Sequence, residues 1–342
     1  MTTPSQPRHP RNRRALVTGH FSTVGDIEVL RHVETRLRAL GVPFEVSPYT
    51  PDLLGLEPGW VDAATLDPAD FTHLVVVCGP YAPNYPVKYP HILGRFRDCV
   101  QVGVNLTMVA PLADCDPFDA LLERDSDRTV RPDLSFLHDA GRVPVVGLCL
   151  VRSQGEYGGR QLHDQAETRL RALLARAGVA VVELDTTLPR VRNHAGIGSG
   201  AEFESILARM DALVTTRLHG TVLALKNGVP VLAVDAIQGR DKVTRQAELL
   251  GWPEIHALDS ASDDALDQAL ARCIEPAAKD RAAAAAARAR ELLAEYDDAF
   301  AAAMDADAQP DRRPVARDRR DRLSALAARY RHWKRRRFPK RS

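Results

Sequence analysis

The chain has 342 residues, 45% of them hydrophobic, and a formal net charge of +1, which is enough chain for two domains with sizeable cores. No apolar run approaches the roughly 18 residues of a membrane-spanning helix, and the polar, basic N-terminus lacks the apolar segment of a signal peptide. The five cysteines are scattered without a Cys-x-x-Cys pair, so neither a disulfide framework nor a zinc site is indicated. These features favour a cytoplasmic protein without a bound metal.

An alternation of strands and helices begins after residues 1–12, which are rich in Pro, Arg and Ser and are predicted to be a disordered tail. Apolar residues recur at helical spacing from Ile27 to Leu40, and Gly41 is placed to end that helix. Short apolar runs on either side predict buried parallel strands. The expected elements are a strand at 15–18, a helix at 26–40, and strands at 44–46, 74–78 and 100–109. This order predicts a Rossmann-like α/β domain over residues 13–141.

The same alternation starts again near Val143 and predicts a second Rossmann-like domain over residues 142–305. The expected strands are 145–151, 179–184, 212–216, 229–234 and 255–257. The expected helices are 162–177, 202–210, 221–226, 242–250, 263–273 and 281–304, the last one long and rich in alanine. Two α/β halves facing a cleft fit this order better than one continuous sheet.

Residues 306–342 form a basic appendage to this α/β body. Residues 311–342 include 14 Arg or Lys and three Asp, a net charge of +11, so the rest of the chain carries −10. Helical spacing recurs from Arg322 to Trp333. Three interpretations stay open: a solvated tail, attachment to an anionic membrane surface at the inner face of the membrane, and nucleic-acid binding. The last is not expected, because no recognition module accompanies the charge.

The most informative stretch is 211–235, which is predicted to form a strand, a loop, a helix and a strand. Arg217 and His219 lie in the loop, at the carboxyl edge of a parallel sheet, where open α/β sheets bind ligands. A helix N-terminus attracts anions, and arginine offers a planar fork to phosphate or carboxylate. Arg152 follows strand 145–151 and would meet the same anion if the two strands are neighbours. The alternatives are a surface ion pair for Arg217 and a helix cap for His219.

Other candidates lie in other loops. The first βα turn contributes Thr23, Gly25 and Asp26. Capping of the following helix is the simpler role for Asp26. Lys242 follows strand 229–234 and is a candidate anion contact. His194 lies in the Gly-rich loop 193–200, which could border the cleft, whereas His163 is expected to face solvent.

The segment from Thr216 to Gly220, with the Gly-Val-Pro sequence at 228–230, resembles the polysaccharide pyruvyl transferase family in its Arg-Leu-His-Gly helix and Gly-Val-Pro strand. Further similar segments are Gly25-Asp26, Arg124-Asp125, Pro132 to Phe136, Gly147 to Arg152, and Lys242 with Leu250-Gly251. The resemblance covers about residues 13–260. It departs from the family at Ser22-Thr23-Val24, where an Asn usually precedes Gly-Asp.

The resemblance implies a GT-B-like fold and transfer of a pyruvyl group from phosphoenolpyruvate to a sugar of a cell-surface polysaccharide or its precursor, forming a ketal. His219 would be the general acid or base, and Arg217 and Arg152 would hold the anion. Thr216 and Gly220 would line the substrate site. The implied partners are phosphoenolpyruvate and a glycan acceptor, with no cofactor. The alternatives are a GT-B-type glycosyltransferase that uses a nucleotide sugar and a non-catalytic protein that binds glycan or membrane.

Overall fold

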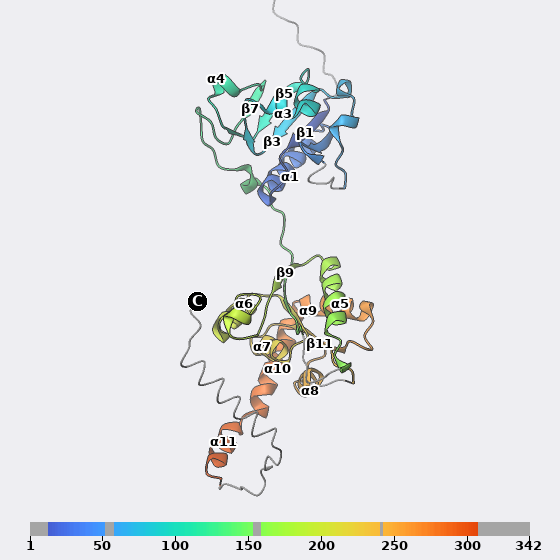
Figure 1. Ribbon diagram of the computed structural model, residues 1–342, viewed down its shortest axis with the longest axis vertical. Helices are drawn as coiled ribbons and strands as arrows, with labels where there is room; N and C mark the ends of the chain where they lie inside the picture. Colours follow the sequence, from blue (N-terminus) through green and yellow to red (C-terminus); the bar gives the residue numbers. More distant parts are fainter. Residues whose placement is uncertain (1–12, 52–57, 153–158, 240–241, 307–342) are drawn as a thin grey trace, which may run out of the picture. The chain divides into compact units, whose positions relative to one another are not determined.

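A computed structural model describes residues 13–51, 58–152, 159–239 and 242–306 (Figure 1). The basic tail after Ala306, including the predicted helix from Arg322 to Trp333, lies outside these residues. The chain divides into two compact units, Met1–Arg142 and Val143–Ser342, each built on a five-stranded parallel sheet. The predicted α/β class with two Rossmann-like halves is therefore confirmed. Within the described ranges, no helix has the length and apolar character needed to cross a membrane.

The first unit has the strand order β2-β1-β3-β5-β7. The strands are β1 (Ala15–Gly19), β2 (Phe44–Pro48), β3 (His73–Val77), β5 (Val100–Val104) and β7 (Ala120–Leu122). The helix α1 (Val24–Ala39) packs against β3 and against a 3₁₀ turn at Leu134–Leu137 (Figure 1). In the described residues, the connections contain short elements: 3₁₀ turns at Ala63–Thr65 and Pro68–Asp70, β4 (Pro80–Tyr81), α3 (Tyr85–Lys88), a π-helical turn at Pro90–Gly94, β6 (Thr107–Met108) and α4 (Leu112–Cys115).

The expectation of a single strand at 100–109 is wrong. The chain turns at Asn105, between β5 and β6. This residue has a φ of +54°, a left-handed conformation that Asn tolerates better than most residues. Its side-chain amide donates to Asp133 Oδ2 at 3.0 Å, and its side-chain oxygen accepts from the Leu134 backbone N–H at 3.1 Å. The apolar run therefore continues past the end of β5 into β6, which pairs with β4 in a separate two-stranded sheet.

The second unit has the strand order β12-β11-β10-β8-β9, with every pair parallel. The strands are β8 (Val145–Cys149), β9 (Ala180–Glu183), β10 (Ala212–Thr215), β11 (Val231–Asp235) and β12 (Ile255–Ala257). The helices are α5 (His163–Arg176), α6 (Gly200–Leu207), α7 (Leu218–Lys226), α8 (Lys242–Leu249) and α9 (Asp263–Ile274), with a 3₁₀ turn at Arg190–Arg192. The helix α7 packs against β10 and β11, and α5 packs against α9. The central strand β10 is buried along its whole length, as its apolar sequence predicts.

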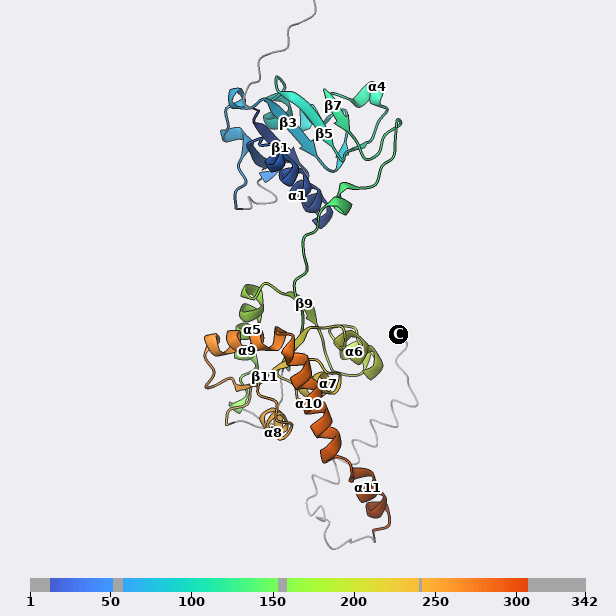
Figure 2. The ribbon, with the colours of Figure 1, turned by 180° about the vertical axis from the view of Figure 1, so that it is seen from behind.

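The expectation of one long helix at 281–304 is also wrong. Two helices occupy this stretch, α10 (Ala277–Leu292) and α11 (Tyr296–Met304). Four alanines of α10 are buried, and α10 packs against α7 and α9, whereas α11 buries no residue. Figure 2 shows α11 continuing from α10 away from the sheet. No Gly or Pro marks the break at residues 293–295. The break falls where packing against the unit ends, which helix propensity alone does not reveal.

Candidate functional site

The first turn of α7 lies at the carboxyl edge of the second sheet. The strand β10 ends at Thr215, and Arg217 is the N-cap residue of α7. Gly220 is buried in the first turn, where an added Cβ would lie 2.3 Å from Thr215 Oγ1. Glycine therefore allows the start of the helix to approach the end of the strand closely. Gly228, with a φ of +68°, follows the helix in a left-handed conformation that glycine adopts readily.

Arg217 is held by groups from neighbouring strand ends. Its Nε donates to the Leu150 carbonyl at 2.8 Å, and its terminal nitrogens lie 3.2 Å from Thr186 Oγ1 and 3.3 Å from Thr187 Oγ1. Nη2 also lies 3.0 Å from Asp185 Oδ1, and 20% of the Arg217 side chain is exposed. The guanidinium therefore links the ends of β8, β9 and β10 and already has a carboxylate partner.

His219 and Arg152, in contrast, are exposed. Neither makes a polar contact with the part of the chain that the structure describes, so both are available to a ligand. The strands that lead to Arg152 and Arg217 are direct neighbours, with Cys149 opposite Thr215. Arg152 lines a cavity of about 400 Å³ together with residues 161–165. The structure thus places a free imidazole and a free cation at one edge of the sheet.

The other predicted residues of this unit have structural contacts. Thr216 is buried, and its Oγ1 accepts from the Val151 N–H at 2.8 Å. Lys242 is the first residue of α8 and is partly exposed. The expectation that His163 faces solvent is wrong: it is 5% exposed. It lies on the same face of α5 as the buried Ala166 and Leu170, at the i+3 and i+7 positions.

In the first unit, Thr23 and Asp26 form a reciprocal cap at the start of α1. The Thr23 backbone N–H donates to Asp26 Oδ2 at 3.1 Å, and the Asp26 N–H donates to Thr23 Oγ1 at 3.3 Å. Thr23, the N-cap residue of α1, and Gly25, in the first turn of that helix, are exposed. The capping role of Asp26 is confirmed, and contact of this turn with a substrate stays a prediction.

The structure adds a residue that sequence reasoning missed, the buried Asp185, which follows β9. Its Oδ1 accepts from the Thr187 N–H at 2.9 Å and contacts Arg217, and its Oδ2 lies 2.9 Å from His194 Nδ1. Burial alone would raise the pKa of Asp185, but the hydrogen bonds from Thr187 and the charge of Arg217 lower it. The rule that ligands bind at carboxyl edges of strands could have pointed to Asp185, two residues after β9.

In the described parts of the chain, no group of three or more His, Cys, Asp or Glu side chains is placed to hold a metal ion. The five cysteines are all buried and unpaired.

Fold and site together define an α/β protein of two Rossmann-like units with an exposed imidazole and a cation at a sheet edge. A family model described as polysaccharide pyruvyl transferase matches residues 157–236. This segment contains β9, β10, α7 and β11, so the resemblance predicted from the Arg-Leu-His-Gly sequence is confirmed over these residues. No match to the chain was found among curated proteins.

Solved structures that resemble the chain include two glycosyltransferases and an epimerase. Spinosyn rhamnosyltransferase SpnG complexed with thymidine diphosphate has 13% identity and a TM-score of 0.31, over 83% of this chain and 100% of that one. Glycosyltransferase VinC in complex with DTDP has 13% identity and a TM-score of 0.31, over 84% and 98%. UDP-GlcNAc 2-epimerase from Methanocaldococcus jannaschii has 9% identity and a TM-score of 0.29, over 82% and 99%.

Proposed function

We propose that the protein transfers a pyruvyl group from phosphoenolpyruvate to a sugar of a cell-surface polysaccharide or its precursor, forming a ketal. The observation that carries this proposal is the family match over residues 157–236, which includes Arg217 and His219 at the start of α7. The exposed His219 and Arg152 at the same sheet edge support it.

The chemistry of the donor suits this edge. Phosphoenolpyruvate carries a phosphate and a carboxylate, and the first turn of α7 offers backbone N–H groups at the positive end of a nine-residue helix. Arg152 supplies a charge that no described residue neutralises. Arg217 stabilises the edge of the sheet next to this site, because it contacts Asp185 and the Leu150 carbonyl.

His219 is the proposed general acid. It gives a proton to C3 of phosphoenolpyruvate while a sugar hydroxyl attacks C2, and the C2 centre becomes tetrahedral. The phosphate then leaves C2, and a second hydroxyl of the sugar closes the ketal. This assignment requires an imidazole that reaches solvent, which is how the structure places His219.

The first test is ligand binding measured as thermal stabilisation. A ligand that binds only the native state at about 100 times its Kd stabilises the protein by about 2.7 kcal/mol. We expect phosphoenolpyruvate to raise the Tm of the full chain. Stabilisation by nucleotide sugars alone would overturn the proposal in favour of a glycosyltransferase.

The second test separates binding from chemistry. His219→Ala should lose pyruvyl transfer by 10²-fold or more, the order of a general acid's contribution, and retain phosphoenolpyruvate binding. The matched control is His138→Ala, which removes a partly buried imidazole, 3.8 Å from Glu28, in the other unit. If the site only binds an anion, neither the wild type nor His219→Ala should transfer a pyruvyl group, and His219→Ala should lose phosphoenolpyruvate binding.

A further inference from the structure

We propose that His194, oriented by Asp185, is a second proton-transfer residue of this site and takes the proton from the attacking sugar hydroxyl. This inference rests on the proposed function. It deepens that function by assigning the base that the acceptor requires.

The imidazole of His194 is held by one buried carboxylate. Asp185 Oδ2 lies 2.9 Å from Nδ1 and accepts from the His194 backbone N–H at 3.3 Å. The Asp185 side chain is 4% exposed and ionised, so it can only accept, and Nδ1 must carry the proton. In the neutral imidazole the lone pair is therefore on Nε2. An imidazole with its Nδ1–H on a buried carboxylate and its Nε2 available is arranged as a general base.

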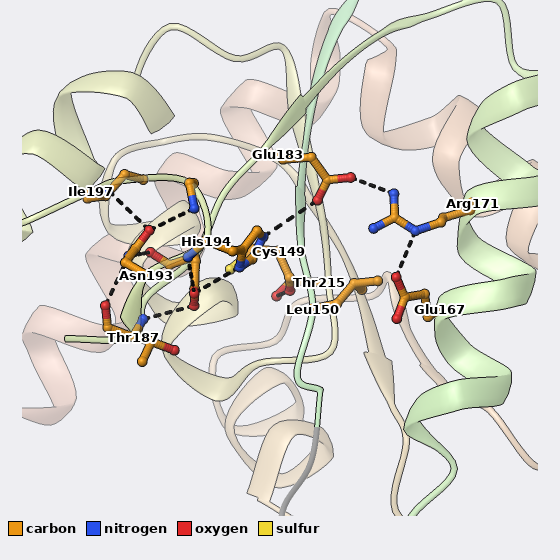
Figure 3. Close-up of polar contacts among 12 residues, drawn as sticks. Cys149, Leu150, Glu167, Arg171, Glu183, Thr187, Asn193, His194, Ile197 and Thr215 are labelled. Carbon is orange, nitrogen blue, oxygen red and sulfur yellow. Dashed lines mark hydrogen bonds and ion pairs between the residues drawn. The ribbon is translucent and has the colours of Figure 1, made fainter. Parts of the chain in front are cut away.

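The His194 imidazole is only partly buried. The His194 side chain is 27% exposed, and Glu183 Oε2 lies 3.8 Å from Nε2. Glu183 is in turn engaged by Arg171, which also holds Glu167 (Figure 3). A distance of 3.8 Å is too long for a hydrogen bond, so Nε2 can accept a proton from a bound hydroxyl.

A purely structural role for the imidazole is weakened by its neighbour Asn193. The buried Asn193 amide donates to the Asp185 carbonyl at 2.8 Å and the Thr187 carbonyl at 2.9 Å. Its oxygen accepts from the Ala195 N–H at 3.0 Å and the Ile197 N–H at 3.1 Å (Figure 3). These four bonds hold the loop without the His194 ring. What the ring adds is an oriented nitrogen at the surface.

Asp185 also connects His194 to the carboxyl edge of the second sheet, where the proposed donor site lies. Its second oxygen contacts Arg217, the N-cap residue of α7, and the strands β9, β8 and β10 lie side by side. One carboxylate therefore fixes the His194 ring and the Arg217 guanidinium relative to each other. A sugar hydroxyl between His194 and a donor bound at α7 would meet the base on one side and C2 on the other.

The proton transfers balance with two histidines. The first sugar hydroxyl forms the O–C2 bond and gives its proton to His194, while His219 gives a proton to C3 and the double-bond electrons form the C3–H bond. His194 then gives its proton to the departing phosphate as the C2–O bond breaks. The second hydroxyl forms its bond to C2 and returns a proton to His219. The products are the ketal and inorganic phosphate, with both histidines restored.

The test uses the full chain, phosphoenolpyruvate, and a panel of methyl glycosides of common hexoses and N-acetylhexosamines. The readouts are phosphate release that depends on the glycoside and the mass of the ketal product. His194→Gln should lower kcat by 10²-fold or more and leave the Kd for phosphoenolpyruvate within about threefold. His138→Gln, matched in exposure and in its carboxylate neighbour, should change neither kcat nor the Kd for phosphoenolpyruvate.

A further readout distinguishes proton transfer from packing. His194→Ala should regain part of its turnover when imidazole is added to the solution. Asp185→Asn should lower kcat as well, because the ring loses the carboxylate that orients it.

The outcomes separate the two proposals. Turnover by His194→Gln and His194→Ala equal to that of the wild type would overturn the role of His194 and leave the pyruvyl transfer intact. Loss of turnover without rescue by imidazole would reduce His194 to a structural residue. A wild type that makes no ketal with any glycoside of the panel would overturn the proposed function and this inference with it.

Discussion

At the scale of single residues, the charged groups at the edge of the second sheet are of two kinds. Arg217 and Asp185 satisfy each other within the fold. Arg152 and His219 reach solvent without a described partner. The first pair sets the shape of the edge, and the second is left for a ligand. Substitutions of the two arginines should therefore differ in kind.

Arg217→Ala should lower both stability and phosphoenolpyruvate affinity, whereas Arg152→Ala should lower affinity alone. Removing Arg217 leaves the buried Asp185 carboxylate short of its charged partner, which we expect to cost about 1–3 kcal/mol. The exposed Arg152 makes no described contact, so its loss should change the free energy of unfolding by less than about 0.5 kcal/mol. Urea unfolding measures the first effect and calorimetric titration the second. Equal destabilisation by both variants would contradict this division.

Glu123 gives the first unit a pH-dependent contribution to stability. It is buried, 1% exposed, and its two oxygens accept from Arg128 Nε and Nη2 at 2.9 Å each. The Arg128 hydrogen bonds lower the pKa of Glu123 from its ordinary 4.5 to about 2. The stabilisation is therefore complete above pH 4.5 and is lost as the pH falls through about 2.

Glu123→Gln should accordingly destabilise the chain by about 1–2 kcal/mol at neutral pH, since Arg128 is half exposed and solvent weakens the pair. The difference from the wild type should narrow below pH 4.5. Urea unfolding at several pH values measures both quantities. Glu45→Gln, at a more exposed pair with Arg14, is the control and should show little difference at any pH. A Glu123→Gln effect that is constant from pH 7 to pH 3 would exclude this explanation.

At the scale of elements, the close approach of α7 to β10 depends on Gly220. The atom nearest to an added Cβ, Thr215 Oγ1, is itself fixed, because it donates to the Cys149 carbonyl and accepts from the Arg217 N–H. Gly220→Ala should therefore displace the start of α7 and destabilise the chain by about 1–3 kcal/mol. Thermal unfolding should show a lower Tm and, with phosphoenolpyruvate added, a smaller ligand-induced shift.

Gly200→Ala is the matched control for this substitution. Gly200 is the first residue of α6, and an added Cβ there meets nothing within 4 Å. Alanine favours the helix by up to about 1 kcal/mol over glycine, so this variant should be neutral or slightly more stable. If Gly220→Ala proved equally harmless, the close contact would not be what fixes α7.

Most strands and helices could be predicted because their signal is local. The buried parallel strands are short apolar runs, and α1 and α5 show helical spacing. The failures depend on contacts distant in sequence. The turn at Asn105 is fixed by residues 133 and 134, and the break after α10 falls where its packing against α7 stops. The site divides in the same way: Arg217 and His219 follow from their place after a strand, but the Asp185–His194 contact requires the folded loop.

At the scale of the whole molecule, charge is distributed unevenly. Residues 311–342 carry a net +11 and the remainder −10, although the chain as a whole is close to neutral. These basic residues lie outside the described structure, and their sequence intersperses Trp333 and Phe338 with Arg and Lys. Such a composition suits an anionic membrane surface, where each basic residue contributes about 1 kcal/mol. Attachment there would bring the proposed transferase close to acceptors linked to lipid.

We therefore predict that the full chain sediments with vesicles containing phosphatidylglycerol and that a chain ending at residue 310 does not. Binding should weaken steeply towards about 1 M salt, where the Debye length falls to about 3 Å, and should be absent with purely zwitterionic vesicles. Replacing Trp333 and Phe338 by Ser keeps the charge of the tail, so this variant separates insertion of aromatic rings from electrostatic attraction alone.

The shortened chain should keep full turnover on water-soluble glycosides, because Arg152, His194 and His219 all lie before residue 306. Equal sedimentation of the full and shortened chains would show that the tail does not bind the membrane. Loss of turnover in the shortened chain would show that the tail contributes to catalysis.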